Sequence, residues 1–268
     1  QDFIALTPGL SQVQTAEIGD IQVNIRGINT GRDTETNFAL VIDGVLQTNP
    51  AALNQELSSV SQIEVLKGPQ GALYGRNALA GAIILTTRKP GDQFELDVGA
   101  GIGSENSYKA NFWAGGTLTE AVRGSLSAYY RTTDGQWDNH VIGCDDCVDY
   151  YEETGVQGRL LFELGGGSFD LKAKYSTVEA GAINFNASLA LAGAAAALDT
   201  PIFQEDPNRH LFQYLNNVKP VNDQDNINVS LKGEWAAGAN TLTGYVAYNK
   251  QDNNFVTDGT SAAFNLYS

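Results

Sequence analysis

Hydrophobic and polar residues alternate along the last two thirds of the chain, and each of seven segments keeps its apolar residues on one parity. Such alternation indicates β-strands with one apolar and one polar face. The polar parity is rich in charge and includes Arg159, Asp170 and Lys172. Strands of about ten residues with this pattern favour a membrane barrel with a wet interior over a soluble β-sandwich. The seven segments cover residues 94–102, 108–114, 122–130, 156–164, 169–175, 227–235 and 242–248.

The lengths of the connections between these segments give a second reason for the same interpretation. Residues 119–121, 165–167 and 237–239 make short connections, and all three fall on one side of the predicted sheet. Two long connections, 134–150 and 179–225, fall on the other side, with one short hairpin at 104–106. Outer-membrane barrels have short periplasmic turns and long external loops.

The first third of the chain has shorter strands and more turn residues. Strands are expected at 21–27, 38–42, 63–66 and 83–87, with a turn at Asp43-Gly44. Gly75 and Gly81 are expected where a side chain would block a close approach of two backbone segments. Any one of these features is common in proteins, so the prediction depends on their occurring together in this order. Residues 71–76 lack the spacing and the Lys-Ser/Thr pair of a phosphate-binding loop.

Residues 63–90, IEVLKGPQGALYGRNALAGAIILTTRKP, carry a specific resemblance. This stretch resembles the end of the plug domain of TonB-dependent outer-membrane receptors. Upstream, IQVNIRG at 21–27 and FALVIDGV at 38–45 are similar to two further plug motifs. The alternative, a glycine-rich strand–turn in a soluble α/β protein, does not account for so many positions in the same order.

The resemblance implies a mostly β protein with two parts. Residues 1–90 would form a small α+β plug domain that is incomplete at its N-terminal end. Residues 91–268 would form the N-terminal part of a large antiparallel transmembrane β-barrel. Because plugged barrels use about 22 strands, seven cannot close one. We therefore expect the sequence to be a fragment of a longer chain.

Composition excludes some other classes of protein. The formal net charge of −15 argues against a nucleic-acid partner, since phosphates would be repelled. No apolar run reaches the roughly 20 residues that a membrane-spanning helix needs. His140 and His210 stand in predicted loops, outside any catalytic motif. We expect neither an enzyme nor a bound cofactor or metal.

The resemblance also implies a function: active import of a scarce nutrient through the outer membrane of a Gram-negative bacterium. The cargo would be a small molecule such as an iron chelate (a siderophore complex), a cobalamin or a glycan. A TonB-type inner-membrane protein would supply the energy through a segment preceding Gln1, and lipid would surround the barrel. The alternative is a passive or adhesive surface barrel without energised import.

Three groups of residues are candidates for this function. By resemblance, Arg26 and Lys67 would pair with carboxylates of the barrel wall, although lysine lacks the bidentate geometry of arginine. Two polar loops would form the plug apex and offer hydrogen bonds to a ligand; the alternative is that they only line a hydrated vestibule. The apex candidates are Arg32, Asp33, Thr34, Glu35, Asn37, Gln47, Thr48, Asn49 and Asn54.

Cys144 and Cys147 are the only cysteines and lie in a predicted external loop. In an oxidising envelope compartment this spacing favours a local disulfide. Half of a zinc site is the alternative, but there is no second cysteine pair. Asp145, Asp146 and Asp149 crowd the same tip; they indicate a solvated acidic loop rather than a cation site.

Overall fold

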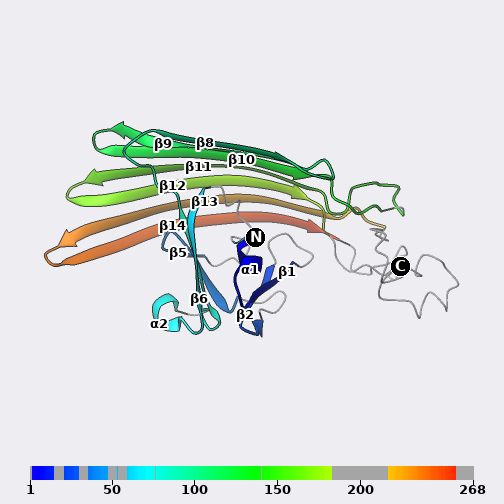
Figure 1. Cartoon of the computed structure of the whole chain (residues 1–268), viewed down its shortest axis with the longest axis horizontal. Coiled ribbons are helices and arrows are strands. Elements are labelled where there is room, and N and C mark those ends of the chain that lie inside the picture. The colour runs from blue at the N-terminus through cyan, green and yellow to red at the C-terminus, as the bar shows by residue number, and fades with distance from the viewer. Residues whose placement is uncertain are drawn as a thin grey trace.

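The computed structural model places a small region of short strands against one face of a long, curved sheet (Figure 1). It describes residues 2–14, 21–29, 36–47, 53, 59–75, 77–139, 141–182 and 217–257. In Figure 1 the long sheet lies across the top and the small region lies beneath it. We call the long sheet the wall sheet and residues 2–87 the inner region.

The wall sheet has seven antiparallel strands in sequential order, from β8 at one edge to β14 at the other. The seven predicted strands are thereby confirmed, and most are longer than the sequence pattern indicated. Their bounds are β8 Glu95–Ile102, β9 Tyr108–Thr119, β10 Val122–Thr133, β11 Tyr151–Leu164, β12 Gly167–Ala180, β13 Val221–Ala237 and β14 Asn240–Val256.

Connections of very different length join the wall strands at the two ends of the sheet. Tight turns at 120–121, 165–166 and 238–239 lie together at one end, on the left in Figure 1. The strand ends that the long connections 134–150 and 181–220 join lie at the other end, where the short 103–107 hairpin joins β8 to β9. This is the division between short and long loops that the sequence predicted.

The two faces of the wall sheet differ as the alternation predicted. Apolar side chains on the face away from the inner region are exposed: Val98 is 67% exposed and Val246 is 74% exposed. Charged side chains occupy the face toward the inner region, where Arg159 is only 2% exposed. Trp113 departs from the pattern because it is buried on the charged face. Among the described residues, no helix is long and apolar enough to span a membrane.

The inner region contains a three-stranded sheet, β1-β2-β3, and a four-stranded sheet, β5-β4-β7-β6. Two short helices accompany these sheets. The elements are α1 Asp2–Leu6, β1 Leu10–Gln14, β2 Ile21–Ile25, β3 Ile28–Asn29, β4 Phe38–Ile42, β5 Val45–Gln47, β6 Val60–Lys67, α2 Gly71–Tyr74 and β7 Gly81–Thr87.

Strand β4 is the centre of the inner region. It pairs in parallel with β7 and antiparallel with β5, and all five of its residues are buried. One face of β4 packs with β2, through Val23 and Ile25, in an apolar cluster, and the other packs against a second cluster. Burial of both faces explains why its sequence, FALVI, is continuously apolar rather than alternating.

Two glycines in this region serve different purposes. A Cβ on Gly81 would lie 2.2 Å from the carbonyl oxygen of Leu66, so the predicted close backbone approach is confirmed. At Gly75 the same expectation is wrong, because a Cβ there would meet nothing within 4 Å. Gly75 instead has φ of 74°, a conformation that a residue with a side chain adopts only at a cost.

Candidate functional site

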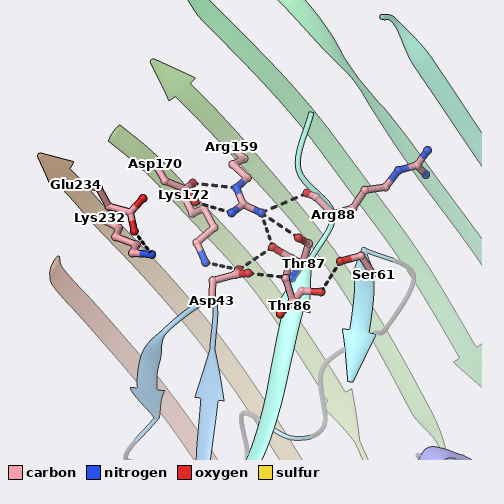
Figure 2. Close-up of polar contacts among 10 residues, drawn as sticks. All are labelled: Asp43, Ser61, Thr86, Thr87, Arg88, Arg159, Asp170, Lys172, Lys232 and Glu234. Carbon is pink, nitrogen blue, oxygen red and sulfur yellow. Dashed lines mark hydrogen bonds and ion pairs between the residues drawn. The ribbon is translucent and has the colours of Figure 1, made fainter. Parts of the chain in front are cut away.

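Five side chains form a buried layer where the inner region touches strands β11 and β12 of the wall (Figure 2). We call this set the ion-pair layer; it consists of Asp43, Thr87, Arg159, Asp170 and Lys172. Asp43 supplies its carboxylate from the β4–β5 turn and forms an ion pair with Lys172. The same carboxylate accepts hydrogen bonds from the backbone N–H of Thr87 at 2.9 Å and from the hydroxyl of Thr87 at 2.6 Å.

Arg159 is the second connection between the wall and the inner region. Its Nε and Nη2 atoms donate to the two oxygens of Asp170 at 2.8 and 2.5 Å, a bidentate pair within the wall. Its Nη1 atom reaches across to Thr87, donating to the hydroxyl at 2.8 Å and to the carbonyl at 3.2 Å, and to the carbonyl of Arg88 at 3.3 Å. Thr87 therefore contacts both Asp43 and Arg159, the two residues that connect the inner region with the wall.

Local backbone geometry explains how Asp43 reaches the wall. Asp43 and Gly44 both have positive φ, 50° and 86°, as in the tight turns that connect paired strands. The backbone N–H of Asp43 donates to the carbonyl of Leu85 at 2.9 Å, which fixes the turn on β7. The apolar strand β4 thus ends in a single carboxylate that is held against the wall.

The strand register of the wall places the two cations side by side. Arg159 on β11 lies directly opposite Lys172 on β12, and Asp170 lies two pairs further along, on the same face of the sheet. The side chains of Arg159 and Lys172 are only 1% and 14% exposed. Two buried cations in adjacent positions would repel each other, so both need a carboxylate nearby. Asp170 comes from the wall and Asp43 from the inner region.

The charges around Asp43 decide its protonation. Burial by itself disfavours the charged form, but the charge and hydrogen bond of Lys172, the hydrogen bond from Thr87 and the charge of Arg159 outweigh burial. The pKa of Asp43 therefore lies below its ordinary value. The carboxylate therefore remains ionised at neutral pH.

A second cationic contact marks the junction between the inner region and the wall. Arg88, just after β7, pairs with Glu95 at 2.6 Å and Asp97 at 3.2 Å on β8. Its guanidinium group also lies 3.8 Å from the ring centre of Trp113. This contact explains why an aromatic residue stands on the charged face: the ring and the cation cover each other.

Nearer the long loops, a cluster on β10 and β11 surrounds the carboxylate of Glu153. Tyr129 and Tyr151 donate their hydroxyls to Glu153, each at 2.7 Å, and Arg131 donates its Nε at 2.6 Å. Because three donors satisfy this carboxylate, the cluster stiffens the wall without needing a further partner.

The predicted apex is mostly beyond what the structure describes. Arg32, Asp33, Thr34, Glu35, Thr48, Asn49 and Asn54 lie outside the described residues, as do His140 and His210. Asn37 is described, and its side chain donates to the carbonyl of Asn29 at 2.7 Å. Gln47 is also described and lines a cavity between the β4–β5 hairpin and the wall. A role for either residue in ligand binding stays a prediction.

The structure does not place Arg26 and Lys67, the predicted plug–wall cations, beside a carboxylate of the described wall strands. Lys67 donates to the carbonyl of Pro8 at 2.5 Å, within the inner region. Arg26 is exposed, and its backbone N–H donates to Gly9 at 2.9 Å. Within the described residues neither side chain forms an ion pair, so their predicted pairing stays a prediction. At strand β12 the contact has the reverse polarity, because the wall cation Lys172 meets the carboxylate of Asp43.

Cys144 and Cys147 are bonded to each other, with Cα atoms 5.9 Å apart. Cys147 and Val148 form a small apolar cluster with Trp137 and Ile142 in the 134–150 connection. The carboxylate of Asp149 accepts hydrogen bonds from the backbone N–H groups of residues 136 and 137, both at 2.9 Å. The loop therefore has a folded base. No group of residues that could hold a metal ion occurs in the part of the chain that the structure describes.

Sequence reasoning missed the ion-pair layer, although it identified the ingredients. Asp43 was interpreted only as a turn residue, and Arg159, Asp170 and Lys172 only as positions on a polar face. One signal was available: an ionisable residue ends a strand, β4, that is buried on both faces. Such a carboxylate needs a cation nearby, and the polar face of the barrel is the nearest source.

Comparison with known proteins relates this arrangement to a family. Residues 1–82 match the family described as the TonB-dependent Receptor Plug Domain. The chain is 30% identical over 141 residues to the pesticin receptor of Yersinia pestis, covering 52% of this chain and 21% of that receptor. It is 28% identical over 139 residues to the vitamin B12 transporter BtuB of Vibrio vulnificus, covering 50% of this chain and 22% of that transporter.

A solved structure extends the likeness to the wall sheet. The ferric yersiniabactin uptake receptor FyuA from Yersinia pestis matches with a TM-score of 0.76 at 19% identity, over 93% of this chain and 38% of that chain. Identity this low shows the fold alone. The chain spans about a fifth of the length of the curated relatives described above.

Proposed function

We propose that this chain, whose residues 1–82 match the plug-domain family, belongs to the TonB-dependent receptors and forms the plug and part of the barrel wall of an active importer. The importer would lie in the outer membrane of a Gram-negative bacterium. Residues 1–90 form the plug in this proposal, and residues 91–268 form the first strands of the barrel. The relatives are receptors and transporters rather than enzymes, which supports transport as the activity.

One observation carries the proposal: among the described residues, an ion pair and hydrogen bonds connect the inner region to strands β11 and β12 of the wall. The ion pair between Asp43 and Lys172 and the bonds from Arg159 can be exchanged for bonds to water. Such an exchange costs little net free energy per bond compared with exposing a packed apolar face. The plug can therefore loosen from the wall and return, as active import through a plugged barrel requires.

The cargo we propose is a scarce small-molecule nutrient, such as an iron chelate, a cobalamin or a glycan. The names of the relatives refer to pesticin, vitamin B12 and ferric yersiniabactin, and two of these three are small nutrients or chelates. A TonB-type protein of the inner membrane would supply the energy by acting on the segment N-terminal to helix α1.

Energised uptake is the test of this proposal. We expect deletion of the gene to abolish uptake of one labelled nutrient and complementation to restore it. Collapse of the inner-membrane proton gradient should stop uptake while leaving binding to the cell surface intact. Uptake that continues without the gradient would instead indicate a passive barrel. Surface attachment without any uptake would indicate an adhesive one.

We also propose that the two polar plug loops bind the ligand. Replacing Arg32, Glu35, Gln47 and Asn49 together with alanine should weaken nutrient binding while leaving barrel assembly intact. A suitable control is Gln62→Ala, because Gln62 is an exposed polar residue on β6 and belongs to neither loop. Unchanged binding and uptake in the fourfold variant would contradict this assignment.

A further inference from the structure

We infer that the ion-pair layer is the gate of a passage between the plug and strands β11–β13. This inference rests on the proposed function and adds to it the route of the cargo and the residues that close it. The geometry that points to it is the position of the layer: it separates two cavities that follow one another along the same stretch of wall.

The first cavity contacts the wall strands on one side of the ion-pair layer, and the second cavity contacts them on the other side. On β12, Lys172 lines the first cavity and Asp170 lines the second. On β13, Ser230 lines the first and Lys232 the second. The two residues of each pair are two positions apart on the same face of their strand. The two cavities are therefore separated by about 7 Å along the strand.

On strand β11 and at the end of the plug, the residues that line the first cavity also give way to residues that line the second at the position of the ion-pair layer. On β11, Gln157 lines the first cavity and Leu161 the second, while Arg159 between them lines neither. On the plug, Thr87 lines the first cavity and Lys89 the second. Arg159 and its partners therefore form a barrier one side chain thick.

Both cavities suit water and polar solutes. The first has a volume of about 50 Å³, which is room for ordered water, between the β4–β5 hairpin and the wall. The second has a volume of about 590 Å³ and lies toward the tight turns, beside Asp92, Arg123 and Glu163. That volume is in the range of small-molecule sites. Opening the layer would join the two spaces into one polar route.

The two sides of the gate differ in how firmly they are held. Arg159 binds carbonyl oxygens of Thr87 and Arg88, which continue directly into the wall through β8. That side is tied covalently to the barrel. The Asp43 side chain has no covalent tie to the wall, and within the described residues the ion pair between the β4–β5 hairpin and the wall is the one between Asp43 and Lys172. The backbone of the hairpin stays paired with β7, so the contact between Asp43 and Lys172 is the half that opens.

Charge balance keeps the gate closed. The layer holds two cations, Arg159 and Lys172, and two carboxylates, Asp43 and Asp170. Removal of the Asp43 charge leaves one buried cation without a partner. An uncompensated buried charge is strongly unfavourable and is relieved by admitting water. Loss of this one charge should thus open the passage, although the plug stays folded.

The experiment is a measurement of ion current through the whole receptor that contains this chain, reconstituted in planar bilayers in potassium chloride. Asp43→Asn keeps the size of the side chain and an acceptor for the N–H of Thr87. We expect it to raise the fraction of time spent conducting on the order of tenfold or more. The matched control is Glu234→Gln, which neutralises a carboxylate paired with Lys232 beside the second cavity but outside the layer. This control should conduct like the wild type.

A double variant tests the role of charge. Asp43→Asn combined with Lys172→Gln removes one charge of each sign, so we expect conductance close to that of the wild type. Three results would overturn the inference: a closed Asp43→Asn variant, an equal rise in Glu234→Gln, or a double variant as conductive as the single one. The assay needs neither nutrient nor energy source. Failure of the gate would therefore leave energised import standing, and failure of import would leave the gate result standing.

Discussion

The inside of the plug and its contact with the wall are built from opposite kinds of interaction. Inside, Val23, Ile25 and Ile83 are completely buried in an apolar cluster that joins the two small sheets. At the contact with the described wall strands, Asp43 meets Lys172, and Arg159 meets backbone carbonyls. The first interface is apolar, and the second is polar and borders two cavities.

This difference explains how one chain can keep its fold and still change its position. Apolar burial stabilises in proportion to the area removed from water, so the core of the plug resists opening. Hydrogen bonds and ion pairs at the wall gain little over bonds to water. A force applied to the plug should therefore break its contact with the wall before its core. The following predictions test that ranking, beginning with the largest effect.

The core of the plug should be the most sensitive place. Leu85→Ala removes a side chain that is 1% exposed, and we expect it to cost ~2–5 kcal/mol in free energy of unfolding of the plug. The measurement is hydrogen exchange of the β4 and β7 amides in the receptor. Leu6→Ala makes the same chemical change at a side chain that is 82% exposed and should cost less than ~0.5 kcal/mol. Equal costs would mean that the plug has no dry core.

The outer face of the wall should be nearly as sensitive, but only to charge. Leu126 is 50% exposed on the apolar face, and Leu126→Lys should cost roughly 2–4 kcal/mol if the site lies near the bilayer midplane. Unfolding by urea in lipid vesicles measures this cost. Asn226→Lys places the same charge on the polar face of β13 and should cost much less. If both substitutions cost the same, the apolar face does not contact lipid.

The contact between plug and wall should weaken in acid. The pKa of Asp43 is below its ordinary value of 3.8, so its ion pair contributes stability above pH 3.8. That contribution is lost as the pH falls through the lower pKa of the folded state. Protection of the Thr87 amide, which donates to Asp43, should be constant from neutral pH to about pH 4 and fall below it.

The variant Asp43→Asn provides the control for this pH dependence. Because it has no carboxylate at this position, its Thr87 amide should show no such acid-dependent loss of protection. A loss of protection centred near neutral pH in the wild type would show that another group controls the contact.

The disulfide should have the smallest effect, because it closes a very short loop. Replacing Cys144 and Cys147 with serine should loosen the cluster around Trp137 and Val148 without changing the stability of the barrel. Hydrogen exchange at those residues and urea unfolding of the whole receptor measure the two expectations. Thiol titration without reductant should find no free thiol. A free thiol or a bound metal ion in the wild type would contradict the bonded pair.

Much of the architecture could be predicted because it depends on local patterns. The period-two alternation determines which side chains of β8–β14 face the plug, and the tight turns at 165–166 and 238–239 determine the pairing of their neighbours. The plug motifs at 38–45 and 63–90 were visible for the same reason. Each of them lies within one stretch of sequence.

The gate could not be predicted because it depends on packing between distant segments. The polar faces of the wall strands hold several cations, and the sequence does not reveal which of them faces Asp43. That choice depends on how far the β4–β5 hairpin projects and on the register that places Lys172 beside Arg159. Trp113 is a similar case, since only its contact with Arg88 explains its position on the polar face.

The large sequence separation between Asp43 and Lys172, 129 residues, has a consequence for the order of assembly. Hairpins joined by two-residue turns need contacts only between neighbouring segments, whereas closing a loop this long carries a large entropic cost and is slow. The gate should thus be among the last contacts to form as the protein matures. Until β12 is in place, the β4–β5 turn presents a hydrated carboxylate to solvent, which favours solubility of the unfinished plug during biogenesis.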